Sequence, residues 1–338
     1  SKTIARAKSP VRISFSGGGS DLTHYFEKFG GAVMNATIKM YSHATLSRRE
    51  DKKISIYSAD LDEHICVDSL EELKSQDKLK LVVEAVSLIN PTYGFNLEIF
   101  SDFPVGSGLG GSAVVLSAVI GCFNHFREDR WDSYEIAELA FQAERISMDV
   151  AGGWQDQYAT VFGGFNFMEF TNEQNIIHPF RISKNTMLEL EENLLLCYSN
   201  ATWSSSNNHK DQKKTFDDNA KSIGDIVEKN KKLAYDFRSN LLRGEINNLG
   251  VMLNKGWELK KQLSKSISNP ELDNMYKYAV DNGAIGGKLL GAGGGGYFLF
   301  YVNPTNKMKL IKALRAKDYN INHVNFDSEG LQAWSVRE

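Results

Sequence analysis

Cysteine is scarce in this chain of 338 residues, which contains only Cys66, Cys122 and Cys197. The three cysteines lie far apart in the sequence, and no CxxC pair occurs. This usage argues against a disulfide framework and against a zinc knuckle, because both need suitably spaced cysteines. The first residues, from Ser1 to Ile4, do not begin a charged and then apolar leader. We therefore expect a protein of the reducing cytoplasm.

The chain also lacks a long apolar run and a strong net charge. The stretch 103–125 carries no charged residue, but it contains Pro104 and several glycines, so we do not expect it to span a membrane. Lys and Arg number 39 against 42 Asp and Glu, which gives a formal net charge of −3. Such a balance predicts neither a nucleic acid nor a membrane as partner. An anionic ligand must therefore be bound by a local arrangement of groups.

What the chain does contain is enough apolar sequence, 42% of its residues, for a large core. Strand and helix patterns alternate without a repeated unit, which predicts an α+β or α/β class with two domains. We expect the domains to cover residues 1–185 and 186–338. The polar composition of residues 204–219 predicts a mobile loop.

The most informative segment is PVGSGLGGSA at residues 104–113, between a predicted strand and an apolar helix predicted for residues 112–126. Glycines let a backbone approach a ligand closely, and a helix start presents unpaired N–H groups, so the segment predicts a phosphate-binding turn. It contains G-x-G-x-x-G, but residues 127–132 are polar and supply no second strand ending in an acidic residue, as a dinucleotide-binding fold requires. A tight turn without a ligand remains the alternative.

Two further glycine clusters occur. Residues 291–296 read GAGGGG and lie directly before an apolar strand, where a flexible linker is the alternative interpretation. Residues 16–21 read SGGGSD and follow a strand that carries Arg12, which is a weak signal when taken alone.

Two carboxylates need an explanation. Glu144 shares a predicted helical face with apolar residues, so it needs a cation, supplied either by a salt bridge or by a metal ion. Asp156 lies in a turn between two glycine pairs, where a surface position or a helix cap is the ordinary interpretation.

Together, these segments resemble the GHMP kinases, the family of galactokinase, homoserine kinase, mevalonate kinase and phosphomevalonate kinase. Residues 104–113 are similar to the family's P-x-x-x-G-L-G-S-S-A motif, with Gly111 in place of the first serine. Residues 288–297 resemble its K-x-x-G-A-G-G-G-G motif, and residues 10–21 resemble its substrate motif. The resemblance implies a two-lobed α+β fold, with an N-terminal ribosomal-protein-S5-like lobe and a C-terminal ferredoxin-like lobe.

The resemblance also implies ATP and Mg²⁺ as cofactors. It assigns the ATP phosphates to Gly106, Gly108, Leu109, Gly110, Gly111, Ser112, Ala113, Gly293 and Gly294. It makes Ser112 a Mg²⁺ ligand together with Glu144, which matches the glutamate in the A-F-Q-x-E-R segment of mevalonate kinase. That match favours the metal over the salt bridge at Glu144.

For the acceptor, Asp156 resembles the aspartate that contacts the reacting hydroxyl, and Arg12 resembles the basic residue beside it. Whether Asp156 takes the proton or only orients the hydroxyl stays open. Asp21 resembles a carboxylate that binds sugar hydroxyls. The acceptor would contact Gly18, Gly19, Ser20, Asp21 and Gly153.

Within the family, residues 14–22, 152–158 and 282–290 are most similar to the branch that phosphorylates the anomeric hydroxyl of D-glycero-D-manno-heptose 7-phosphate. The alternatives are a fucokinase, a galactokinase-like enzyme, or a non-catalytic sensor of ATP and sugar. This chain lacks an arginine that we expect near the position of Trp203. We expect a monomer or homodimer with a sugar phosphate substrate, whose phosphate could bind Lys39, Arg181, Lys210 or Lys213.

Overall fold

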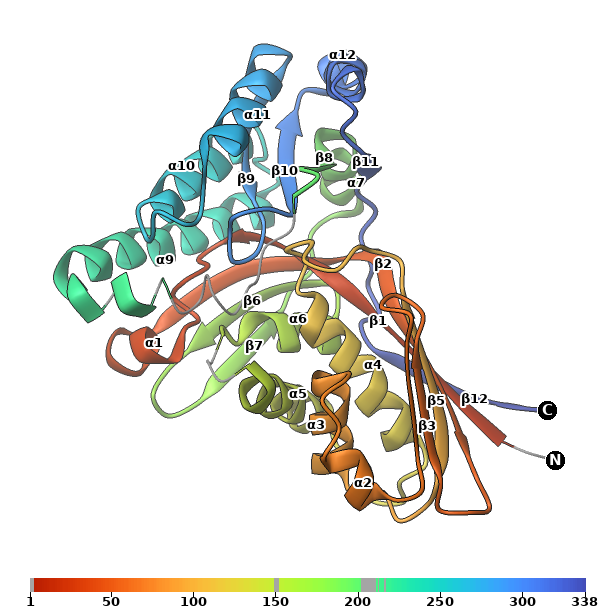
Figure 1. The fold of residues 1–338 in the computed structure, drawn as a ribbon. Coiled ribbons are helices and arrows are strands. Elements are labelled where there is room, and N and C mark those ends of the chain that lie inside the picture. Colours follow the sequence, from red (N-terminus) through yellow and green to blue (C-terminus); the bar gives the residue numbers. More distant parts are fainter. Residues whose placement is uncertain (1–2, 149–151, 202–210, 212, 216) are drawn as a thin grey trace.

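Two β-sheets and the helices packed on them make up the fold (Figure 1). The computed structural model describes residues 3–148, 152–201, 211, 213–215 and 217–338. Within these residues, the strands of the first sheet are β1 (Thr3–Ser16), β2 (Gly31–Arg48), β3 (Ile54–Ser58), β4 (Glu63–Val67), β5 (Phe95–Ser101), β6 (Phe165–Phe170), β7 (Asn175–Pro179) and β12 (Gln332–Arg337). Their order is β12-β1-β2-β5-β3-β4, and β6 extends the sheet by pairing with β2 and β7.

The second sheet is smaller and antiparallel, in the order β11-β8-β10-β9. Its strands are β8 (Leu194–Tyr198), β9 (Ala284–Leu289), β10 (Tyr297–Val302) and β11 (Ile321–His323). The helices are α1 (Thr23–Phe29), α2 (Leu70–Lys74), α3 (Lys80–Ile89), α4 (Gly111–His125), α5 (Ser133–Met148), α6 (Gln155–Phe162), α7 (Lys184–Asn193), α9 (Ala220–Arg243), α10 (Leu249–Lys261), α11 (Pro270–Asp281) and α12 (Pro304–Ala316). This mixture of strands and helices confirms the predicted fold class.

Helix α4 is the central helix of the larger half of the molecule. It packs on β1 and β2, and α3, α5 and α6 pack around it, as Figure 1 shows. Its residues are buried on almost every side, including Val114, Leu116 and Phe123, which explains why its sequence has no polar face. The start of α4 is therefore held rigidly beside the first sheet.

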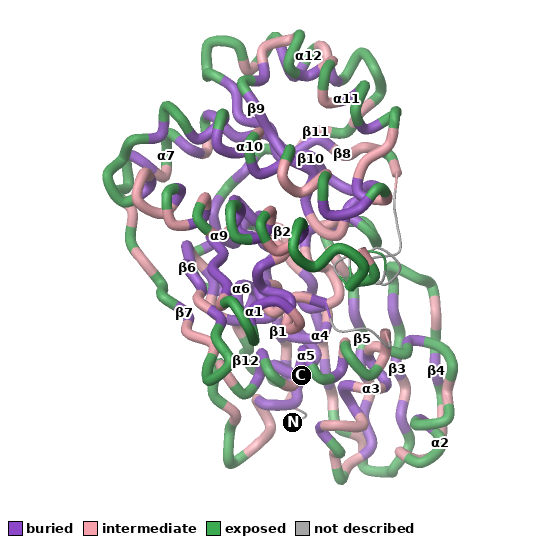
Figure 2. The backbone as a smooth tube through the Cα atoms, turned by 90° about the vertical axis from the view of Figure 1, so that its left-hand side faces the viewer, coloured by how far each residue is buried: buried purple, intermediate pink, exposed green. Residues whose placement is uncertain are grey.

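The opposite face of β1 and β2 is also buried, against α9 and β10. Phe15 stacks on Phe237 with ring centroids 5.0 Å apart, and both side chains belong to one apolar cluster with Leu299. Figure 2 shows that buried residues gather along these central strands, whereas outer helices such as α2 and α12 carry exposed residues. The two sheets are thus joined through a shared core.

The last strand returns to the first sheet. β12 pairs antiparallel with β1, from Thr3 opposite Arg337 to Lys8 opposite Gln332. The proposed division into residues 1–185 and 186–338 stays a prediction, and any such division leaves the C-terminal strand in the sheet of the first half.

The local helix signals have mixed outcomes. Asp132 and Glu135 form the expected reciprocal cap of α5, since each backbone N–H donates to the other's carboxylate, at 3.2 and 2.9 Å.

Residues 202–210, 212 and 216, within or beside the predicted loop, lie outside the described residues. The described residues between 211 and 218 are helical, so the loop prediction is wrong for them. No helix that the structure describes is long and apolar enough to cross a membrane.

Candidate active site

The first glycine turn, residues 104–111, connects β5 to α4. Gly106, Gly108 and Gly110 have φ angles of 74°, 79° and 78°, a region that residues with a Cβ rarely adopt. Gly110 is the N-cap of α4, so the free backbone N–H groups of the helix start follow this turn directly. The turn therefore has the conformation and the donors that suit an anionic ligand.

The second glycine turn, residues 290–296, packs directly on the first. A Cβ on Gly108 would lie 2.3 Å from the carbonyl oxygen of Leu290, and a Cβ on Gly291 would lie 2.5 Å from the Cα of Gly108. Tyr297 N donates to the Ser107 carbonyl at 2.9 Å. The two turns, almost 200 residues apart in the sequence, form one backbone surface because glycine leaves no side chain between them.

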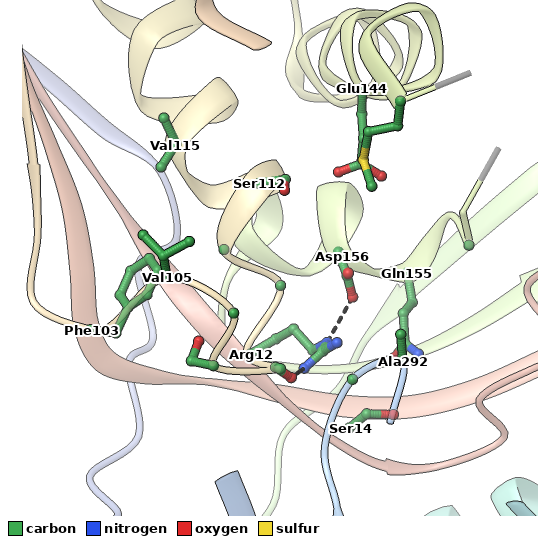
Figure 3. A pocket seen from close by; sticks show the side chains of 18 of the residues that line it. Arg12, Ser14, Phe103, Val105, Ser112, Val115, Glu144, Gln155, Asp156 and Ala292 are labelled. Atoms are coloured by element: carbon green, nitrogen blue, oxygen red, sulfur yellow. Dashed lines mark hydrogen bonds and ion pairs between the residues drawn. The ribbon is translucent and has the colours of Figure 1, made fainter. Parts of the chain in front are cut away.

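Both turns line a cavity of about 590 Å³. Figure 3 shows part of its wall, with Ser112 on α4 and Glu144 on α5 on one side of Asp156, and Ser14 and Ala292 on the other. The predicted ligand-binding residues that line this cavity are Arg12, Gly18, Gly19, Asp21, Gly106, Gly108, Gly110, Gly111, Ser112, Glu144, Gly153, Asp156 and Gly293.

Arg12 and Asp156 form an ion pair inside the cavity. Arg12 is 3% exposed and donates from Nε to Oδ1 of Asp156 at 2.7 Å, and from its Nη1 to the Gly108 carbonyl at 2.9 Å. Asp156 lies in the first turn of α6, and a Cβ on Gly110 would stand 3.2 Å from its Cγ. One buried guanidinium thus connects the first glycine turn to the carboxylate (Figure 3).

Asp21 is the second carboxylate at this end. It is 4% exposed and accepts hydrogen bonds from the backbone N–H groups of Gly19 and Gln155, at 3.1 and 3.3 Å. Burial, and secondarily the charge of Asp156, raise the pKa of Asp21 above its ordinary value. A Cβ on Gly153 would stand 1.8 Å from Oδ2 of Asp21, so any other residue there would displace this carboxylate.

Four predicted ligand-binding residues do not line the cavity: Ser20, Leu109, Ala113 and Gly294. The Ser20 hydroxyl instead donates to the carbonyls of Gly17 and Ala32, at 2.7 and 2.9 Å. Gly294 N donates to the Ile267 carbonyl at 2.8 Å. Ser20 and Gly294 therefore fix the shape of loops whose neighbouring residues face the cavity.

Glu144 forms no ion pair with any cation that the structure describes. Its hydrogen bond comes from the amide of Gln157, at 3.4 Å. Burial, and then the charge of Asp156, raise the pKa of Glu144 to about 8. No described lysine or arginine therefore supports the salt-bridge interpretation. A cation bound between Glu144 and Ser112 would relieve the cost of burying this carboxylate.

Other cavity residues were not predicted from the sequence. Lys260 and Lys288 also line the cavity, near Asp21, and only Lys288, the lysine of the K-x-x-G motif, had a signal in the sequence. The lining also contains an apolar group: Leu79, Leu81, Val82, Ile99, Phe103, Val105 and Val115. Lys39, Arg181 and Lys213 do not line the cavity, and Lys210 lies outside the described residues.

Comparisons with known proteins identify the family of this chain. The model of the GHMP kinases N terminal domain matches residues 80–164, and the GHMP kinases C terminal model matches residues 237–320. The D-glycero-alpha-D-manno-heptose 7-phosphate kinase of Campylobacter jejuni is 39% identical over 99% of this chain and 100% of that protein.

Solved structures show the same fold. A D-glycero-D-manno-heptose 1-phosphate kinase from Bacteroides thetaiotaomicron has a TM-score of 0.83 at 27% identity, over 99% of this chain and 100% of that one. Lactococcus lactis galactokinase in complex with galactose has a TM-score of 0.79 at 19% identity, over 97% and 95% of the two chains. The domain matches and the full-length similarity show that this chain belongs to the GHMP kinases and is a kinase that transfers phosphate to a hydroxyl group.

Proposed function

We propose that this protein transfers the γ-phosphoryl group of ATP to the anomeric hydroxyl of D-glycero-D-manno-heptose 7-phosphate, giving heptose 1,7-bisphosphate. The observation that carries the reaction is the Arg12–Asp156 ion pair, which lies between the first glycine turn and Asp21 in one cavity. The acceptor is proposed from the relative of that name, which is 39% identical over its full length.

The nucleotide would lie along the two glycine turns. Free N–H groups at the start of α4 can donate to phosphate oxygens, and the partial positive charge of a helix start favours an anion there. Adenine would lie in the apolar part of the cavity, between Leu79, Ile99 and Phe103. A planar base buries well among such side chains.

Mg²⁺ would bind between Ser112 and Glu144. Both offer oxygen ligands, which this ion prefers, and Glu144 has no other cation among the described residues. No group of three or more acidic, His or Cys side chains in the described residues could hold a metal without other ligands. That fits an ion held by one or two protein oxygens and completed by phosphates, where it neutralises charge on the nucleotide.

Asp156 would contact the reacting hydroxyl. A carboxylate at that point orients the oxygen for in-line attack and can take its proton, which contributes about 10²–10⁴ to the rate. Arg12 holds this carboxylate in place and would stabilise negative charge on the group in transfer. Because Arg12 also bonds the Gly108 carbonyl, it fixes the carboxylate relative to the turn that holds the phosphates.

The sugar would bind on the Asp21 side of Asp156. Ser14 Oγ faces this part of the cavity and has no hydrogen-bond partner among the described residues, although it is buried. Gln155 and Asn35 share a hydrogen bond of 3.3 Å nearby. Such polar groups match a ligand with several hydroxyls, since a buried polar atom costs free energy until it is paired.

An acceptor panel tests the proposal. The purified protein is incubated with ATP, Mg²⁺ and heptose 7-phosphate, unphosphorylated heptose, L-fucose or D-galactose, and ADP release is measured. We expect turnover with heptose 7-phosphate, and a second phosphorus signal at the anomeric carbon by NMR. A preference for fucose or galactose would show that heptose 7-phosphate is not the acceptor. ATP binding without ADP release on any sugar would support the sensor alternative.

A further inference from the structure

Two lysines near Asp21, at the proposed acceptor end of the cavity, have no role in the chemistry described so far: Lys288 is buried and Lys260 is partly buried. Lys288 is on β9 and is 5% exposed, and no described residue accepts a hydrogen bond from its ammonium group. Lys260, near the end of α10, donates to the carbonyls of Leu289 and Gly291. Neither lysine forms an ion pair with a carboxylate in the part of the chain that the structure describes.

The carboxylates near these two lysines already have other partners. Arg12 is already paired with Asp156, and Asp21 accepts two backbone hydrogen bonds. Burial and the charge of Arg12 lower the pKa of Lys288 to about 7, and burial with the charge of Lys288 lowers that of Lys260. An anion bound here would offset the cost of burying the two charges.

An anion bound by these lysines would lie at the proposed acceptor end of the cavity, near Asp21. The charged groups near Lys288 are Arg12, Asp21 and Lys260, and Asp21 is the residue proposed to contact the sugar. Ser112 and Glu144, the proposed metal ligands, lie on the opposite side of Asp156 from Ser14 (Figure 3). The ATP phosphates would already have donors at the start of α4, so the lysines remain for a second phosphate.

We propose that Lys288, with Lys260 beside it, binds the phosphate monoester of the acceptor and so selects a phosphorylated sugar. This inference rests on the proposed function and adds a specificity site to it. Lys288 makes the contact, because its ammonium has no other partner in the described structure. Lys260 contributes charge while it holds the start of the second glycine turn.

The test is Lys288→Met, which keeps most of the length of the side chain and removes its charge. A hydrogen bond to a charged group implies that KM for heptose 7-phosphate rises by about tenfold to a hundredfold. We expect KM for ATP to stay at its wild-type value. The matched control is Lys277→Met, which removes one positive charge from the exposed pair with Asp281 on α11.

The outcomes separate the two proposals. If wild type does not require a phosphorylated acceptor, the proposed function and this inference both fail. If the wild type requires a phosphorylated acceptor but Lys288→Met leaves the KM for that acceptor unchanged, this inference alone fails. It also fails if the variant raises the KM for ATP instead, a result that would assign the lysines to a nucleotide phosphate.

A binding measurement without turnover makes the test independent of catalysis. Heptose 7-phosphate is titrated calorimetrically into the wild type and the variant without nucleotide. Affinity should fall in the variant by a factor similar to the KM change, and equal affinity would overturn the inference. The thermal midpoint checks folding, and Lys288→Gln serves if the methionine variant is unstable.

Discussion

Gly108 and Gly291 lie backbone against backbone, so that a Cβ on Gly291 would stand 2.5 Å from the Cα of Gly108. The φ of Gly291 is 82°, which adds backbone strain to the steric conflict for any other residue. This contact joins the two halves of the proposed phosphate-binding surface and leads to the first prediction.

Gly291→Ala should separate the two turns. We expect a loss of about 1–3 kcal/mol in the free energy of unfolding, measured by urea denaturation, together with a raised KM for ATP. Gly224→Ala is the control, because a Cβ there meets no atom within 4 Å, and alanine favours an α-helix by up to about 1 kcal/mol over glycine. Equal behaviour of the two variants would contradict the predicted role of the contact.

Asp156→Ala should lose nearly all turnover while it still binds nucleotide. The carboxylate is proposed to act on the acceptor hydroxyl, so kcat should fall by about 10²–10⁴. ATP affinity, measured by calorimetry, should change little. Asp281→Ala, at an exposed position of α11, is the control. Full activity of Asp156→Ala would remove this residue from the mechanism.

Arg12→Lys should lower kcat although the charge is kept. A lysine has no planar fork and cannot reproduce the geometry by which Arg12 bonds both Asp156 and the Gly108 carbonyl. We expect a larger loss in kcat than in the thermal midpoint, measured on the same preparation. An enzyme with unchanged kcat would show that charge alone is sufficient at this position.

Glu144→Gln should raise the Mg²⁺ concentration that gives half-maximal rate. The amide is a weaker ligand than the carboxylate for a hard cation. Glu138→Gln, on the exposed face of the same helix, is the control. If the metal titration of Glu144→Gln matches that of the wild type, the carboxylate has a role other than holding the ion.

The value of kcat/KM for the acceptor should fall as Lys288 loses its proton with rising pH. Its pKa is lowered to about 7, so the free enzyme has the charged lysine below that pH and the neutral one above it. Arg12, Asp21 and Lys260 are the charged groups facing it. Acceptor binding should weaken as the pH rises through 7, by up to about tenfold per unit. Lys288→Met should lose this decline, and a wild-type profile that stays flat from pH 7 to 9 would contradict the assignment.

Features that depend on nearby residues were predictable from the chain alone. The sequence indicated α4 through its continuous apolar residues, the cap of α5 through Asp132 and Glu135, and the first glycine turn through its position between strand and helix. Each of these depends on contacts within a few residues, so a local pattern is sufficient to predict it.

Long-range contacts were not predictable in this way. The sequence determined which residue types are available for the proposed chemistry, namely two glycine turns, a set of carboxylates and Arg12. Only the tertiary structure decided that Gly291 packs on Gly108, that Lys260 and Lys288 line the same cavity as Asp21, and that β12 pairs with β1. The reason is physical: such contacts form between segments brought together by burying a shared core, and no local periodicity records which distant segment becomes a neighbour.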